Sequence, residues 1–298
     1  MCCSIKALAL VPLNTVSAIN SFSKLLIITR ETQTVILTAV KSIFNGNYYI
    51  EKELNAIMNV IIKNDYKEVS ELAANYMLNT IKAKNDAVLG LPTGSTPLEM
   101  YKILVKEYMY NNISFKYVKT FNLDEYRGIE KTNTNSYYYF MNQNLFSHID
   151  IEKENINIPN GMAIDAQQEC ISYEHKIKEA GPMDILFLGI GENGHIGFNE
   201  PAGYFEPYTH EVQLQKNTIE VNSRFFNNID EVPKTAITMG IKTILSAKKI
   251  VLLAAGLSKA DAIAQTVNGK ITPQLPASIL KLHNDITIII DKDAARNI

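Results

Sequence analysis

The stretch DILFLGIGENGHIGFNEP, residues Asp184–Pro201, decides the fold and holds the first candidate site. Its apolar run, Ile185–Leu188, is typical of a strand that is buried on both faces. Glycines interrupt the chain after this run, and the polar residues among them are Glu192, Asn193, His195, Asn199 and Glu200. Glycine lets the backbone approach a ligand closely, and histidine titrates near neutral pH. The stretch therefore predicts an active-site rim at the end of a sheet strand, against the alternative of a surface turn with an incidental histidine.

The composition is that of a globular protein with a sizeable core. The chain has 298 residues, of which 46% are hydrophobic and 20% charged, and its net charge of −2 argues against a general nucleic-acid binder. No run of about 18 uninterrupted apolar residues occurs, and the N-terminus is a weak secretory signal, so we expect no membrane partner. Three cysteines, Cys2, Cys3 and Cys170, lack metal-type spacing and fit a reducing compartment, the cytoplasm.

The chain divides near residue 57. Residues 1–57 mix Ser, Thr and Asn with β-branched residues and show no clean period, whereas Met58 begins a natural first strand. We expect residues 1–57 to be an extension that is poorly packed or a mis-assigned start. The alternative is a small helical appendage over a sheet edge. Residues 58–298 are expected to form a single α/β domain.

Strands and helices alternate along this domain. A first strand is predicted to begin at residue 58. Short apolar runs predict further strands at 86–91, 119–123, 185–188, 236–240, 250–255 and 286–290. Helical spacing and capping residues predict helices at 65–82, 97–109, 135–147, 165–180 and after 256. Residues 202–215 are expected to be a loop and a candidate lid. This order predicts an open, mostly parallel, Rossmann-like sheet with helices on both faces, a three-layer αβα fold.

The turn between the strand 86–91 and the next helix predicts an anion seat. It contains Gly94, Ser95 and Thr96, and Pro97 stands where a helix begins. Free backbone N–H groups, the helix dipole and the hydroxyls all favour an anion there. Because no Gly-Lys-Ser/Thr follows, a phosphate monoester suits the turn better than a nucleoside triphosphate. The alternative is an ordinary strand-to-helix turn.

Two adjacent carboxylates, Asp124 and Glu125, follow the strand 119–123 and are placed for proton transfer. Successive side chains diverge along a strand, so only one of the two is expected to face a substrate. Taken alone, these residues are better interpreted as a solvated turn. Beside the histidine loop, catalysis becomes the better interpretation, because all these polar clusters follow strands and should meet at one sheet edge.

Five motifs, TGSTP, TFNLDEY, LGIGENGHIGFNEP, NSRFF and GLSKA, together resemble the glucosamine-6-phosphate deaminases from about residue 58 to the C-terminus. The resemblance implies an enzyme that converts D-glucosamine 6-phosphate and water to D-fructose 6-phosphate and ammonia, with no metal and no cofactor. It implies that His195 opens the sugar ring, that Glu200 and Asn193 are grouped with His195, and that Asp124 carries out the enolisation. Arg224 and Lys259 match the family's phosphate-binding cations, beside the turn 94–96.

Two departures from the family pattern matter. Asn193 stands where some members carry Asp, which excludes a carboxylate relay through that position and leaves Glu200 as the charged partner of His195. The positions that match the effector pocket of activated hexameric members include Gly203, His210, Val212 and Gln213. We therefore expect no activation by an acetylated amino sugar phosphate, and a monomer or small homo-oligomer. Residues 1–57 have no counterpart in the family.

Two other functions remain open from the sequence. A 6-phosphogluconolactonase-like hydrolase would share the fold and the phosphate handling but would not need a proton shuttle at Asp124. A non-catalytic sugar-phosphate-binding regulator could keep Arg224 and Lys259 and discard the acid and base residues. The presence of Asp124, His195 and Glu200 together argues against the regulator.

Overall fold

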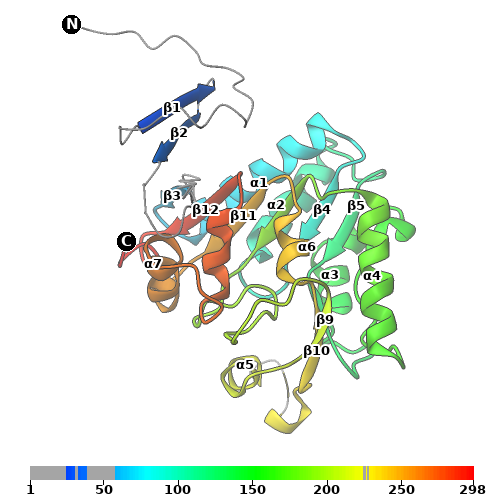
Figure 1. The fold of residues 1–298 in the computed structure, drawn as a ribbon. Helices are drawn as coiled ribbons and strands as arrows, with labels where there is room; N and C mark the ends of the chain where they lie inside the picture. The colour runs from blue at the N-terminus through cyan, green and yellow to red at the C-terminus, as the bar shows by residue number, and fades with distance from the viewer. Residues whose placement is uncertain (1–24, 31–32, 39–57, 224–225, 227) are drawn as a thin grey trace, which may run out of the picture. The chain divides into compact units, whose positions relative to one another are not determined.

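A seven-stranded parallel sheet carries the main unit of the chain (Figure 1). The computed structural model describes residues 25–30, 33–38, 58–223, 226 and 228–298. Every strand pair in this sheet is parallel, in the order β3-β12-β11-β8-β4-β5-β7. The strands are β3 (Asn59–Lys63), β4 (Val88–Leu91), β5 (Lys119–Asn122), β7 (Ile156–Asn157), β8 (Ile185–Leu188), β11 (Ile250–Ala254) and β12 (Ile286–Asp291).

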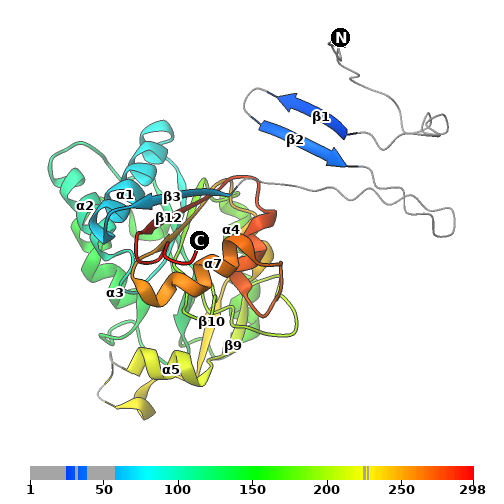
Figure 2. The same cartoon turned by 90° about the vertical axis from the view of Figure 1, so that its left-hand side faces the viewer.

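Helices cover both faces of this sheet because its central strands are apolar on both sides. In β8, Ile185 and Phe187 pack into one core with the buried faces of α1, α2 and α3. Leu186 and Leu188, which point the other way, pack into a second core with α4, α6 and α7. Figure 2 shows α1, α2 and α3 on one side of the sheet and α4 and α7 on the other. The expected three-layer αβα fold is confirmed.

The helices begin where the sequence places capping residues. Asp65 accepts the N–H of Glu68 at the start of α1, and Asp165 accepts the N–H of Gln168 at the start of α4. The helices are α1 (Tyr66–Ala83), α2 (Leu98–Met109), α3 (Tyr137–Asn144), α4 (Ala166–Ala180), α5 (Lys216–Asn222), α6 (Ile241–Leu245) and α7 (Ala260–Asn268). Short 3₁₀ turns are formed by Phe146–His148, Lys153–Asn155, Ile229–Glu231, Leu257–Lys259 and Pro276–Leu282.

A second, three-stranded antiparallel sheet corrects the expected topology. It has the order β6-β10-β9, with β6 (Asp124–Tyr126), β9 (His210–Gln213) and β10 (Thr235–Thr238). The run 236–240 was expected to be a strand, and β10 lies there, but it pairs antiparallel with β6 and β9, a partner choice that a short apolar run does not reveal. The expected loop 202–215 contains β9, whose burial alternates as in a half-buried strand, so that part of the prediction is wrong.

The N-terminal part of the chain, Met1–Asn55, is a separate unit. Its described residues form an antiparallel hairpin in which β1 (Leu25–Arg30) pairs with β2 (Gln33–Thr38), from Leu25 opposite Thr38 to Arg30 opposite Gln33. These residues are strands and not the helix of the alternative interpretation. The rest of the predicted extension, residues 1–24, 31–32 and 39–57, lies outside the described residues.

Candidate active site

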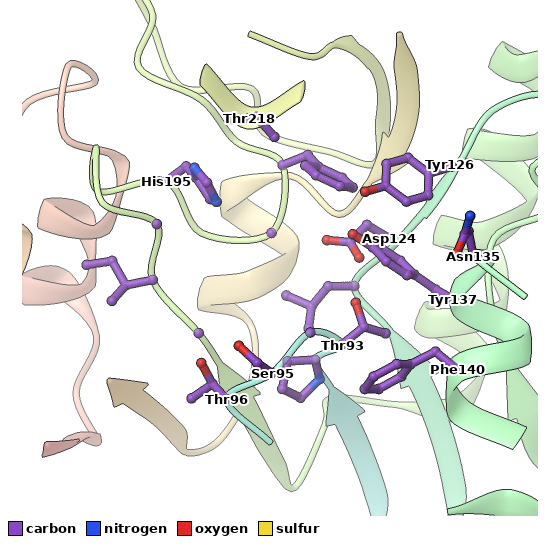
Figure 3. Close-up of a pocket in the computed structure, with 18 of the residues that line it drawn as sticks. Thr93, Ser95, Thr96, Asp124, Tyr126, Asn135, Tyr137, Phe140, His195 and Thr218 are labelled. Atoms are coloured by element: carbon purple, nitrogen blue, oxygen red, sulfur yellow. The ribbon is translucent and has the colours of Figure 1, made fainter. Parts of the chain in front are cut away.

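A cavity of about 300 Å³ lies where several parallel strands end. Its walls come from the segments that follow β4, β5, β8 and β11, which lie far apart in the sequence. Figure 3 shows Asp124 and His195 facing one another across it, with Ser95 and Thr96 at the same opening. The cavity brings together the predicted site residues Gly94, Ser95, Thr96, Asp124, His195 and Lys259.

Asp124 lies on the first position of β6 and is a buried acid, 7% exposed. Burial raises the pKa of its carboxyl to about 8, with a smaller contribution from the charge of Glu125. Gly197, at φ +58°, leaves the carboxyl its space, because a Cβ there would lie 3.4 Å from Asp124 Oδ2 and 2.9 Å from Thr238 Oγ1. Asp124 is therefore a proton acceptor of raised pKa on the cavity wall.

Glu125 points away from the cavity, as its neighbour's orientation requires. Its Oε1 accepts the N–H groups of Tyr126 and Tyr137, and its Oε2 accepts that of Tyr138, each at 2.9 Å. Burial raises the pKa of Glu125 to about 7 in spite of these three bonds, which act to lower it. Glu125 thus anchors the start of α3, and of the two carboxylates Asp124 lines the cavity and Glu125 does not.

Asn193 connects His195 to Glu200. Its Nδ2 donates to Glu200 Oε2 at 2.8 Å, and its Oδ1 lies 2.8 Å from His195 Nδ1. The Glu200 carboxylate can only accept hydrogen bonds, so it fixes the Asn193 amide with Nδ2 toward Glu200 and Oδ1 toward His195. The Oδ1 atom is also only an acceptor, so Nδ1 of His195 must carry the proton. The Nε2 atom of neutral His195 is then an unprotonated nitrogen, available as a base at the cavity.

Glu200 is held as the charged member of this group. Burial alone would raise its pKa, but hydrogen bonds and charge from His195, with further hydrogen bonds from Thr218 and Asn193, hold the pKa below its ordinary value. Glu200 Oε2 also lies 3.5 Å from His195 Nδ1. The shortest contact of the imidazole is with Asn193, and Glu200 acts on it both directly and through the Asn193 amide. Neither Asn193 nor Glu200 lines the cavity; both lie behind His195.

The predicted anion seat has the expected backbone. Gly94 has φ +90°, and the turn leads through Pro97 into α2. Lys259 lines the same cavity from the start of α7 and interacts with a neighbouring group. Arg224, the second predicted cation, lies outside the described residues.

Two features of the site escaped the sequence analysis. The first is an aromatic wall, in which Tyr126, Tyr137 and Phe198 pack against one another with ring centroids 4.8–6.0 Å apart. Tyr126 stands two residues after Asp124 on the same strand, so period-two alternation was the available signal. The second is Thr218 of α5, whose hydroxyl donates to Glu200 Oε1 and for which the sequence holds no signal.

The described residues contain no group of three or more His, Cys, Asp or Glu side chains arranged to hold a metal ion. None of their helices combines the length and apolar character that crossing a bilayer requires. The absence of a metal or cofactor requirement stays a prediction.

Comparisons with known proteins agree on one family. Residues 64–289 match the family model of glucosamine-6-phosphate isomerases/6-phosphogluconolactonase. A glucosamine-6-phosphate deaminase of Clostridium novyi is 60% identical over 238 residues, which are 80% of this chain and 99% of the relative. The solved structure of a monomeric glucosamine-6-phosphate deaminase matches with a TM-score of 0.79 at 47% identity, over 81% of this chain and all of that one. A 6-phosphogluconolactonase from Trypanosoma cruzi matches with a TM-score of 0.67 at 21% identity, over 81% of this chain and 97% of its own, which shows the fold alone.

Proposed function

The chain belongs to the family of glucosamine-6-phosphate isomerases and 6-phosphogluconolactonases, and we propose that it is a glucosamine-6-phosphate deaminase. The reaction converts D-glucosamine 6-phosphate and water to D-fructose 6-phosphate and ammonia, a step of amino-sugar catabolism. The single observation that supports it best is the convergence of Asp124, His195 and the 94–96 turn on one cavity.

Ring opening is assigned to His195. Its Nε2 takes the proton of the anomeric hydroxyl and returns one to the ring oxygen, so that the C1–O5 bond breaks and the aldehyde forms. The charged Glu200 and the bridging Asn193 stabilise the imidazolium that exists between the two transfers. Asn193 and Glu200 therefore act as positioning residues behind the imidazole.

Enolisation is assigned to Asp124. Its carboxylate takes the C2 proton of the open-chain amino aldehyde and delivers a proton to C1, while one proton of the amino group passes to O1, leaving an alcohol at C1 and an imine at C2. Water adds to that imine, and ammonia leaves as the ketone of fructose 6-phosphate forms. The buried site raises the pKa of Asp124 to about 8, which makes its carboxylate a stronger base than an exposed one.

The phosphate is assigned to the turn 94–96 with Lys259, and with Arg224 beyond the described residues. The turn offers backbone N–H groups and hydroxyls, and the lysine offers a point charge. Binding the phosphate away from C1 and C2 holds the reacting carbons in register with the acid and base.

We further propose that the enzyme is a cytoplasmic monomer that needs no activator. The monomeric deaminase that matches this fold supports the oligomeric state, and the buried free thiol of Cys170 fits a reducing compartment. The residues at 203, 210, 212 and 213 support the lack of activation. Residues 1–57 are proposed to be dispensable for catalysis.

Ammonia release from glucosamine 6-phosphate by purified protein tests the proposed function. Lactone hydrolysis, measured with 6-phosphogluconolactone in the same preparation, tests the hydrolase alternative. Release of ammonia without lactone turnover is the expected result. Lactone turnover without ammonia would assign the hydrolase reaction, and binding of the sugar phosphate without either product would assign a regulator.

A further inference from the structure

The hydroxyl of Tyr66 lies behind the anion-binding turn. Tyr66 is the first residue of α1, and its hydroxyl lies 3.0 Å from the carbonyl oxygens of both Ser95 and Thr96. The same oxygen accepts the N–H of Glu99 at 3.2 Å. A tyrosine hydroxyl has one donor and can also accept, so one group serves both the turn and the helix that follows it.

Tyr66 supplies a cap that α2 lacks. Pro97, the N-cap residue, makes no side-chain hydrogen bond to the helix. Glu99 is the second residue of α2, where the backbone N–H has no partner inside the helix. By accepting that N–H from outside the cavity, Tyr66 fixes where α2 begins relative to the turn.

Tyr66 also orients the peptide groups of the turn. The C=O and N–H groups of a trans peptide point in opposite directions, so a Ser95 carbonyl that faces Tyr66 directs the Thr96 N–H away from Tyr66. Leu98 N–H reaches the same carbonyl at 3.5 Å. Within the described residues, the N–H groups of Gly94, Ser95 and Thr96 donate to no protein acceptor, and all three residues line the cavity.

We propose that Tyr66 is a positioning residue for the substrate phosphate: its hydroxyl holds the Ser95 and Thr96 carbonyls out of the cavity and thereby presents the amide N–H of Thr96 to the anion. The inference rests on the proposed function, which places the phosphate at this turn. Tyr66 does not touch the substrate, and its effect reaches only the group that the turn binds.

The test is Tyr66→Phe, which keeps the ring and removes the hydroxyl. Because the loss of a hydrogen bond is typically worth 0.5–1.5 kcal/mol, we expect KM for glucosamine 6-phosphate to rise roughly 3- to 10-fold with kcat little changed. The dissociation constant of inorganic phosphate, measured by titration calorimetry, should rise by the same factor. Turnover of unphosphorylated glucosamine at high concentration, where it is measurable in the wild type, should not change.

Tyr76→Phe is the matched control. Tyr76 lies on the same helix, and its ring packs 5.6 Å from the ammonium nitrogen of Lys249 rather than at the turn. The Tyr76→Phe variant should keep both the KM for glucosamine 6-phosphate and the affinity for phosphate at the wild-type values. Thermal unfolding of both variants checks that the fold is intact, and calorimetry measures affinity on the folded protein independently of turnover.

The outcomes separate this inference from the proposed function. Unchanged phosphate affinity in Tyr66→Phe would overturn the role of Tyr66, whatever the enzyme's activity. An equal loss of kcat with phosphorylated and unphosphorylated sugar would also overturn it, because that pattern indicates a structural tether. Wild-type protein that releases no ammonia would contradict the proposed function, while the phosphate titration would still decide the role of Tyr66.

Discussion

Asn193 Oδ1 lies 2.8 Å from Nδ1 of His195, and this contact determines which nitrogen of the imidazole is free to act. The amide cannot rotate without losing its bond to Glu200, so the buried carboxylate sets the tautomer through one intervening side chain. The relay has a neutral centre, in contrast to a carboxylate placed directly on the ring.

Asp124→Asn should reduce kcat by roughly 10²- to 10⁴-fold, the contribution typical of a general base. The amide has nearly the same shape and cannot take the C2 proton, so affinity for the substrate should change little. Ammonia release measures kcat, and calorimetric binding of fructose 6-phosphate measures affinity. A variant with near wild-type kcat would refute the base role.

The pH dependence should follow the raised pKa of Asp124. Since the carboxylate form is needed and its pKa is about 8, kcat/KM should rise with pH through that region. Glu125→Gln removes the neighbouring negative charge, so the acid limb of the profile should move to lower pH. An unmoved limb, or one moved upward, would contradict the assignment of this limb to Asp124.

The same raised pKa gives a stability test. A folded-state pKa above the unfolded value stabilises the protein most below the unfolded pKa, about 4, and that contribution is lost as pH rises through about 8. The Asp124→Asn variant has no titratable group at this position. Its free energy of unfolding relative to wild type should therefore increase between pH 5 and pH 9 in urea titrations, and a constant difference would be the contrary result.

The role of His195 can be isolated in an enzyme that cannot enolise. In Asp124→Asn, ring opening should continue, so the protein should still speed the interconversion of the α and β anomers of glucosamine 6-phosphate, followed by NMR exchange. Adding His195→Gln should abolish that acceleration, because the amide cannot shuttle the proton. Equal anomer exchange in the single and double variants would assign ring opening to another group.

Deleting residues 1–57 should leave kcat and KM at the full-length values, since every described residue that lines the cavity lies after position 90 and Tyr66 also lies outside the deleted segment. The truncated chain should also migrate as a monomer and show no response to N-acetylglucosamine 6-phosphate. Activity assays with and without this sugar phosphate, with light scattering, measure all three. Failure of the truncated chain to fold would show that the extension belongs to the core.

Most of the fold was predictable because buried parallel strands and amphipathic helices leave strong periodic signals. The run 185–188 and the cap at Asp65 are where the sequence places them. The antiparallel sheet was missed because β6, three residues long, continues almost directly from β5, and pairing partners are not encoded in a short apolar run.

The residues of the candidate site likewise differ in how far the sequence predicts them. Gly94, Asp124 and His195 stand directly after strands, so the sheet topology predicts that they meet. Tyr66 and Thr218 reach their partners through tertiary packing, from the start of α1 and from α5, and no local pattern marks such contacts. Residues next to His195 in the sequence, such as Asn193, were therefore visible, whereas Tyr66 and Thr218, which act from other elements, were not.

Asp124 and His195 are positioned by different sheets. Asp124 belongs to the small antiparallel sheet, whereas His195 and the 94–96 turn follow strands of the large one. The two sheets meet at Leu123, whose N–H donates to the Leu91 carbonyl and whose C=O accepts the Met239 N–H, so we expect changes at this junction to alter the distance between Asp124 and His195. For protein engineering, that junction is the place to resize the cleft for bulkier amino sugars while leaving every reacting side chain intact.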